Sequence, residues 1–128
     1  MRKHLRTKAR DRGQAAIEYL GFLPLLLIVG LAGLQLGMAA YAAQQAGTAA
    51  RAAARADTVD VLDGEVRPDA KAAGYAAMSG WIASRSDIEV QGGVATVIVE
   101  IPRVLPFWDF EPVKKTATMP EPQDQEGP

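Results

Sequence analysis

The chain has 128 residues, one histidine, no cysteine and a formal net charge of −1. This length allows one small domain beside a membrane anchor, and the lack of cysteine excludes disulfide bonds and thiolate chemistry. The charge is divided unevenly, because residues 1–13 hold six basic residues and one acidic residue, a net +5, which leaves −6 for the remainder. We predict that residues 1–13 form a basic leader peptide. A basic arm can also contact nucleic acid, but this one has no interleaved aromatic residues and precedes an apolar stretch, so no nucleic-acid partner is expected.

A long apolar stretch follows the leader. Residues 19–50 carry no formal charge, and Gln35 is the only strongly polar side chain in residues 19–43. At about 1.5 Å of helix rise per residue, this stretch is more than long enough to cross a hydrocarbon core of roughly 30 Å. We predict that residues 14–56 form a single-pass transmembrane helix with an Ala-rich extension, kinked at Pro24. Basic residues beside a span stay on the cytoplasmic side, which places the N-terminus in the cytoplasm and the C-terminal lobe outside the cell membrane.

One acidic residue, Glu18, lies near the start of the apolar helix. An acidic residue costs up to about 3 kcal/mol at the centre of a membrane helix, so such residues usually have a partner or a function. Gly13 ends the basic leader five positions earlier, and Tyr19 follows Glu18 directly. This arrangement at the head of an apolar helix resembles the processing site of type IV prepilins, most closely the Flp/Tad branch. Together with the Leu-rich run at residues 23–27 and the Ala-rich run at 49–56, it resembles the TadE/TadG-type pseudopilins.

The resemblance implies a processing site and a set of partners. It implies cleavage between Gly13 and Gln14 by a membrane-embedded prepilin peptidase. It also implies that the Glu18 carboxylate, with Tyr19 beside it, pairs with the free amino group of a neighbouring subunit during assembly. The implied partners are the membrane, the peptidase, other pilin or pseudopilin subunits and the Tad assembly platform, and the implied locations are the cell membrane and the surface pilus. Many type IV pilins have Phe or Met after the cut where this chain has Gln14, which leaves N-terminal methylation open.

The apolar helix also contains candidates for helix association. Gly33 and Gly37 form a GxxxG motif, in which small residues four apart allow two helix backbones to approach closely. Lipid-facing glycines of no consequence are an equal alternative. Gln35 lies between them in the sequence, and it is expected either to hydrogen-bond across such an interface or to lie near the far headgroups.

Residues 57–119 are expected to form a small α+β lobe. It is predicted to contain an amphipathic helix over residues 70–84 with Trp81 as a core anchor, and Asp69 as its N-cap. A period of two, with Gly92 and Gly93 at the centre, predicts an antiparallel hairpin. The two strands are placed around Ile88 and Val90 and over Val94–Ile101, and a third strand is placed over Val113–Met119.

Three further segments of the lobe have no regular pattern. Residues 57–69 form an acidic connector whose carboxylates lack the spacing of a calcium loop, so no metal site is expected. An aromatic cluster, made of Phe107, Trp108 and Phe110, is expected to cover the sheet edge; the alternative is a contact patch for a subunit or for the outer membrane surface. Residues 120–128 have the composition of a disordered tail.

Three functions remain in competition. The first is a TadE-like minor pseudopilin or pilus-assembly component. The second is a small secreted domain with an ordinary signal peptide cleaved near Ala42, which explains the basic arm but not Glu18. The third is a membrane-anchored enzyme, and the lack of cysteine and of any histidine beyond His4 argues against it. No catalytic residue and no cofactor are therefore expected.

Overall fold

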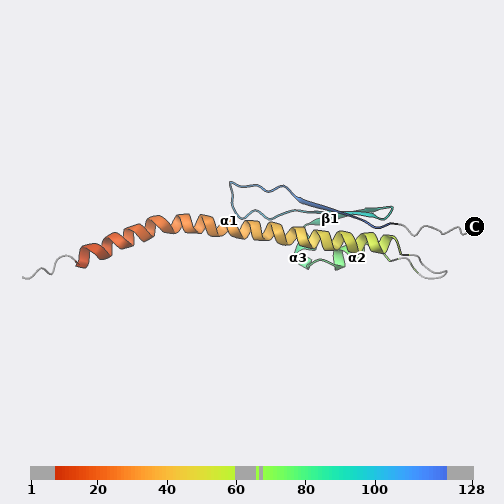
Figure 1. The fold of residues 1–128 in the computed structure, drawn as a ribbon, viewed down its shortest axis with the longest axis horizontal. Coiled ribbons are helices and arrows are strands. Elements are labelled where there is room, and N and C mark those ends of the chain that lie inside the picture. Colours follow the sequence, from red (N-terminus) through yellow and green to blue (C-terminus); the bar gives the residue numbers. More distant parts are fainter. Residues whose placement is uncertain (1–7, 60–65, 67, 121–128) are drawn as a thin grey trace, which may run out of the picture.

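The computed structural model describes residues 8–59, 66 and 68–120, and it consists of one long helix and a small lobe (Figure 1). The long helix α1 spans Lys8–Asp57, and the lobe contains two short helices and a three-stranded antiparallel sheet, so the α+β prediction is confirmed. The elements of the lobe are α2 (Ala70–Ala76), α3 (Gly80–Ala83), β1 (Ser86–Gln91), β2 (Val94–Val99) and β3 (Val113–Thr118).

Helix α1 is continuous over 50 residues, and Pro24 lies inside it. Figure 1 shows that α1 curves over its N-terminal half, the half that contains this proline, and that it is straighter along the lobe. The helix begins at Lys8 rather than at residue 14, so it includes the last residues of the basic leader. The physical reason is that Lys, Ala and Arg favour helix, and no proline interrupts the chain before Pro24.

The sheet is a simple meander of antiparallel strands in the order β1-β2-β3. Gly92 and Gly93 have φ angles of +58° and +75°, which suit the tight two-residue turn predicted between β1 and β2. The face of the sheet that packs on α1 includes Ile88, Val97 and Val99, all of them buried. The third strand is confirmed, whereas β2 ends at Val99, two residues before its predicted end.

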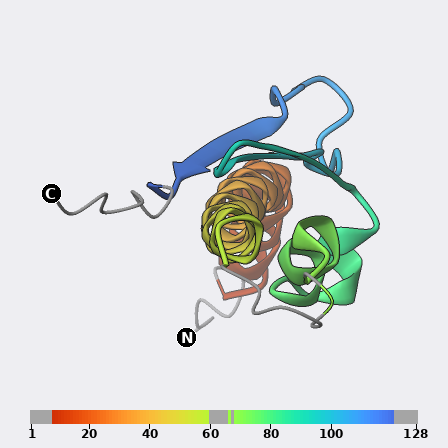
Figure 2. The same cartoon turned by 90° about the vertical axis from the view of Figure 1, so that its right-hand side faces the viewer.

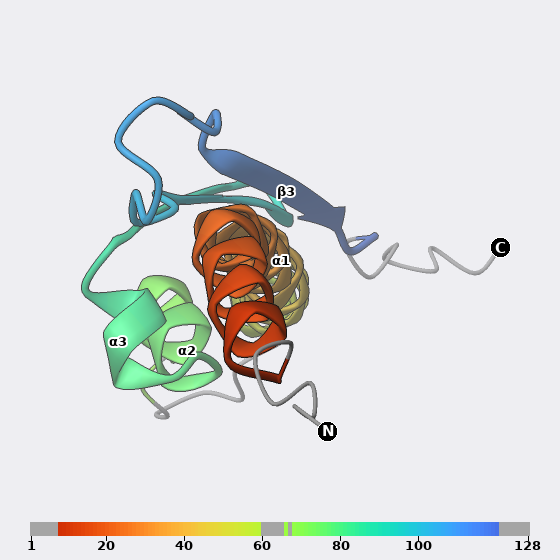
Figure 3. The same cartoon turned by 90° about the vertical axis from the view of Figure 1, so that its left-hand side faces the viewer.

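The described elements of the lobe pack on two sides of α1. Seen from either end, the sheet covers one side of the helix and α2 with α3 covers another, while the remaining side is open (Figures 2 and 3). Both layers approach α1 closely because the buried positions of the helix are small. The buried residues that α1 contributes to this core are Ala42, Ala46, Ala49, Ala50, Ala53 and Ala54.

Two predictions about the lobe helices are wrong. The predicted helix over residues 70–84 is two short helices, since Ala77 caps α2 and the extended backbone of Ser79 precedes α3. Trp81 is 44% exposed and lies against the Arg85 guanidinium, 5.5 Å from the ring centroid, while its neighbour Ile82 is buried. The break rotates the second half of the segment, so a single helical stripe cannot describe both halves.

The N-cap prediction for the first of these helices is confirmed. The Asp69 carboxylate accepts hydrogen bonds from the backbone N–H groups of Lys71 (3.0 Å) and Ala72 (3.3 Å). Most of the acidic connector, residues 60–65 and 67, and nearly all of the predicted tail, residues 121–128, lie outside the described residues.

Candidate membrane and assembly surface

The N-terminal half of α1 extends away from the lobe and exposes an apolar surface. Large side chains from Ile17 to Leu34 are exposed, and they belong mainly to leucine, isoleucine and phenylalanine. Among the described residues, one helix is long and apolar enough to cross a membrane, and it is the part of α1 from Gly13 to Asp57. Almost none of its most apolar window is buried, whereas the core helix of a soluble protein would be mostly buried. The structure therefore contains a helix with the properties of a single-pass membrane anchor.

The predicted processing and assembly residues lie at the start of this exposed surface. Gly13, Gln14, Glu18 and Tyr19 are all exposed, and all are helical. Glu18 follows Gln14 by four residues, so the two lie one turn apart on the same face. Glu18 and Tyr19 line a shallow groove of about 270 Å³ together with Ala15 and Phe22. The Glu18 carboxylate has no ion pair among the described residues.

The three predicted helix-association residues do not share an environment. Gly33 and Gly37 are exposed, and a Cβ atom added to either glycine would meet no other atom within 4 Å. Gln35 points the other way and is 1% exposed. Its Nε2 donates to the Pro102 carbonyl oxygen (3.1 Å), and its Oε1 accepts from the Val104 N–H (2.8 Å). The glycines are thus free to contact a neighbour, while both polar ends of the Gln35 amide are bonded within the chain.

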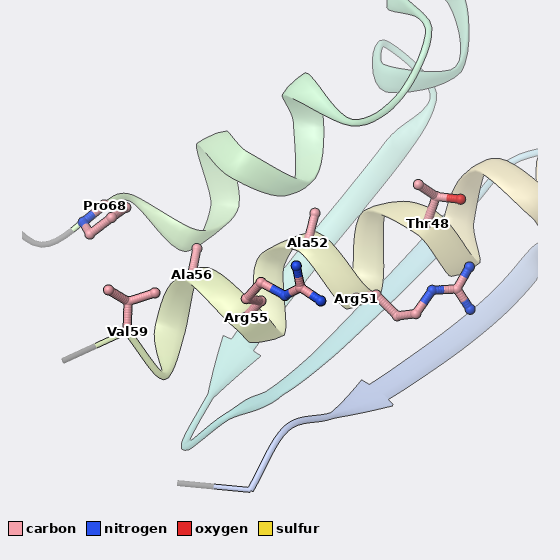
Figure 4. Close-up of a pocket in the computed structure, with 7 residues that line it drawn as sticks. All are labelled: Thr48, Arg51, Ala52, Arg55, Ala56, Val59 and Pro68. Atoms are coloured by element: carbon pink, nitrogen blue, oxygen red, sulfur yellow. The ribbon is translucent and has the colours of Figure 1, made fainter. Parts of the chain in front are cut away.

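An exposed stripe continues from the glycines along the open side of α1. We call it the open stripe, and it consists of Gly33, Gly37, Gln44, Thr48, Arg51 and Arg55, spaced three, four or seven residues apart, which keeps them on one helix face. Near the C-terminal end of α1 the stripe borders a hollow of about 490 Å³, whose other wall includes Val59 and Pro68 (Figure 4). Arg51 and Arg55 are solvent-exposed, as expected for a solvated helix face.

No metal-binding cluster accompanies this surface. In the described ranges, no group of three or more His, Cys, Asp or Glu side chains is arranged to hold a metal ion. The single histidine, His4, lies outside those ranges. The side chains of the candidate surface are therefore one carboxylate, two arginines and a few neutral polar groups beside small and apolar residues.

The sequence analysis did not identify the residues of α1 that pack against the lobe. The Ala-rich segment is predicted only as an extension of the helix, whereas its alanines form the core under the sheet. The available signal was the spacing of Ala42, Ala46, Ala49, Ala53 and Ala56, which repeats every seven residues.

Comparison with known proteins gives one match. Residues 13–55 match the model of the TadE-like protein family, so the resemblance to TadE-type proteins is confirmed over this segment, about a third of the chain. The family is a structural and assembly family of pili and not an enzyme family. The match therefore indicates a component related to Tad pili with an N-terminal helix suited to span a membrane. Neither the curated proteins nor the solved structures give a match.

Proposed function

We propose that this chain, whose residues 13–55 form a TadE-like segment, is a minor pseudopilin or pilus-assembly component of a Tad-type system. Its helix α1 spans the cell membrane, is cleaved after Gly13 and then packs against other pilin subunits. The observation that carries the proposal is the Glu18 carboxylate, which is exposed, is the single formal charge in residues 13–50 and has no ion pair among the described residues.

The dimensions of α1 support membrane insertion. Residues 13–34, which lie before the lobe, number 22. They span about 33 Å at 1.5 Å per residue, which matches a hydrocarbon core of roughly 30 Å. Gln35, the first residue of α1 bonded to the lobe, follows directly. The basic leader at the other end favours a cytoplasmic N-terminus, and the lobe then lies on the opposite side of the membrane.

The position of Glu18 supports a role in assembly. Placing an unpaired carboxylate among apolar side chains costs desolvation free energy, and a cationic partner offsets part of that free energy. Cleavage after Gly13 creates such a cation, the α-amino group of Gln14, one helical turn before Glu18 in the same chain. A parallel neighbour shifted along the helix axis by about one turn, roughly 6 Å, brings its amino group level with this carboxylate. The pair would therefore select one register between subunits.

The open stripe supports packing between subunits. In an assembled filament, the apolar half of α1 must be buried again once it leaves the lipid. Gly33 and Gly37 offer close backbone approach in the apolar half, and the other residues of the stripe are exposed in the described part of the chain. The stripe is thus a continuous surface on which a second helix can lie without displacing the lobe.

The signal-peptide alternative conflicts with the packing of the lobe. Cleavage near Ala42 would cut α1 where it is already covered, since Ala42 is 2% exposed and belongs to the core. It would also remove Gln35 and leave the backbone groups of Pro102 and Val104 without their partner. The lobe is therefore built on a helix that a signal peptidase would sever.

The test is the N-terminus of the protein purified from its native cells, measured by mass spectrometry. The proposal expects a mature chain that begins at Gln14. A chain that begins near residue 43 would support the signal peptide, and an untrimmed chain would contradict processing.

The substitution Gly13→Leu sharpens this test. A peptidase must open the helix around the scissile bond, and a branched side chain beside that bond obstructs access. Gly13→Leu is expected to abolish trimming and to leave the full-length chain in the membrane. Gly21→Leu is the matched control, because Gly21 also lies in α1 with no neighbouring atom within 4 Å of an added Cβ. Equal trimming of the two variants would contradict a role for Gly13.

A further inference from the structure

The segment between β2 and β3, residues 100–112, forms the end of the lobe that is nearest to the N-terminal half of α1 (Figure 1). We call it the β2–β3 loop. We propose that this loop is a second membrane contact, which lies in the phospholipid headgroup layer with Phe107 and Trp108 inserted. The proposal rests on the proposed insertion of α1, and it assigns these two residues a lipid surface as their partner.

Gln35 fixes the loop to α1 at one height along the helix. Its buried amide holds the Pro102 carbonyl and the Val104 N–H, which lie on either side of Arg103. Leu105, next in the chain, is also buried and anchors the loop to the lobe. The base of the loop is therefore held by two hydrogen bonds and a buried side chain.

The height of this attachment coincides with the expected membrane surface. The exposed large aliphatic side chains of α1 end at Leu36, and the hydrogen bonds that hold the loop are made by Gln35, one residue earlier. A hydrocarbon core of roughly 30 Å that begins near Gly13 ends within a few residues of this point. The headgroup layer occupies about 5–8 Å beyond it, so a loop held at Gln35 lies within or beside that layer.

The side chains at the loop tip suit this layer. Phe107 is 72% exposed and Trp108 is 46% exposed, so the expectation that these two aromatic residues cover the sheet edge is wrong. The indole of Trp108 stacks on Phe110 with ring centroids 5.6 Å apart, which limits its freedom without burying it. Tryptophan is enriched at membrane interfaces, because its apolar ring and polar N–H suit a layer that is half apolar and half hydrated.

The loop holds four charged residues with a net charge of −2, and all four are exposed: Glu100, Arg103, Asp109 and Glu111. Arg103 and Asp109 form an exposed ion pair of 2.7 Å across the loop, so their charges are mutually compensated. Neither side chain needs a further protein partner, and water in the headgroup layer can solvate both. Two contacts, the helix and the loop tip, would then define the rotation of the lobe about the helix axis, and hence the side of α1 that faces neighbouring subunits.

The two tryptophans of the chain provide a matched pair for the test. Trp81 and Trp108 are almost equally exposed, at 44% and 46%. They differ in height, because the helix that carries Trp81 begins beside residues 41–45 of α1, through the Tyr41–Ser79 and Gln45–Ser79 hydrogen bonds. This attachment lies six to ten residues beyond Gln35, or about 9–15 Å farther from the membrane.

The experiment uses the full chain in phospholipid nanodiscs. The variants Trp81→Phe and Trp108→Phe each retain one tryptophan, and both are checked for the same circular dichroism spectrum and thermal unfolding midpoint. Quenching is measured with phospholipids brominated near the glycerol and with others brominated near the chain ends. We expect Trp108 to be quenched mainly by the shallow bromines, with a blue-shifted emission, and Trp81 to be quenched by neither.

The outcomes separate this inference from the proposed function. Resistance of the protein to alkaline carbonate extraction from its native membrane reports insertion of α1, and extraction would contradict the proposed function itself. If the protein resists extraction but Trp108 is quenched no more than Trp81, the loop does not touch the membrane and the inference is overturned. Equal, strong quenching of both tryptophans would also overturn it, because the whole lobe would then lie on the bilayer.

Discussion

The two halves of α1 are both helical and both apolar, but they differ in the size of their side chains. From Ile17 to Leu34, large residues are exposed, whereas from Ala42 to Ala56 the helix buries alanine after alanine under the lobe. The difference shows that hydrophobicity alone does not decide what packs inside this protein. Small residues let the sheet and α2 approach the helix, and the larger side chains remain outside for a lipid or protein environment.

Glu18 is the one charged residue in the exposed apolar half of α1, residues 13–34, so its replacement should have the largest effect on assembly. Glu18→Val removes a charge whose placement in a membrane helix costs up to about 3 kcal/mol, so insertion is expected to be unchanged or improved. Incorporation into surface filaments should be lost or strongly reduced, because the pairing with the neighbouring amino group is gone. The measurement compares the amount of protein in sheared filaments with the amount in the membrane.

Glu18→Asp sharpens this result, since it retains the charge on a shorter side chain. It is expected to assemble better than Glu18→Val. Normal filament incorporation of Glu18→Val would contradict the pairing role, whatever Glu18→Asp does.

Replacement of one buried alanine by a larger residue should disrupt the packing between the C-terminal half of α1 and the lobe. Ala53 is fully buried, and Ala53→Leu forces extra methylene groups into a close-packed layer, which is expected to cost about 1–3 kcal/mol of unfolding free energy. Leu26→Ala, on the exposed half, is expected to leave the unfolding of the lobe unchanged. Both are measured by denaturant titration of tryptophan fluorescence in the same nanodiscs, and equal effects would refute the division between the halves.

Gln35 marks the boundary between the halves, and its loss should loosen the β2–β3 loop. Gln35→Leu leaves the Pro102 carbonyl and the Val104 N–H without their partner, at an expected cost of about 1–2 kcal/mol, because water reaches part of this loop. Hydrogen exchange of the Val104 amide should accelerate accordingly. Gln44→Leu, on the open stripe, is the control and should leave this exchange rate unchanged.

The smallest expected effect concerns the close approach of α2 to α1. A Cβ atom added at Gly74 would lie 2.7 Å from Ile88 Cδ1 and 3.2 Å from Ala53 Cβ. The clash outweighs the better helix propensity of alanine, so Gly74→Ala should destabilise the lobe by about 1 kcal/mol. Gly80→Ala, where an added Cβ meets no atom, should be neutral or slightly stabilising in the same thermal unfolding experiment.

The sequence predicted the elements of this fold where a pattern was long or a residue type was decisive. The charge-free run predicted α1, and the Gly92-Gly93 pair between alternating residues predicted the hairpin. Asp69 was identified as an N-cap because its side chain suits that position. These are local signals, and they depend on neighbours within a few residues.

The features that the sequence did not predict depend on distant contacts. Gln35 could not be assigned to the β2–β3 loop, because its partners lie 67 and 69 residues away. Alanine is common on both buried and solvated helix faces, so the sequence does not show which alanines of α1 the sheet buries. Trp81 resembled a core residue because a single helix was assumed, and the break before Gly80 placed Ile82 in the core instead.

The central claim, that α1 passes from lipid to lobe near Gln35, can be tested directly because the chain has no cysteine. Leu26 and Gln44 are both exposed in the structure, so the fold of the chain itself does not make single-cysteine variants at these positions differ. The assay uses native cells whose outer layers are permeabilised while the cell membrane stays intact. A membrane-impermeant maleimide is expected to label Gln44→Cys rapidly and Leu26→Cys not at all until detergent is added. Equal labelling of the two before detergent would show that the exposed half of α1 is not in the membrane and would contradict the account.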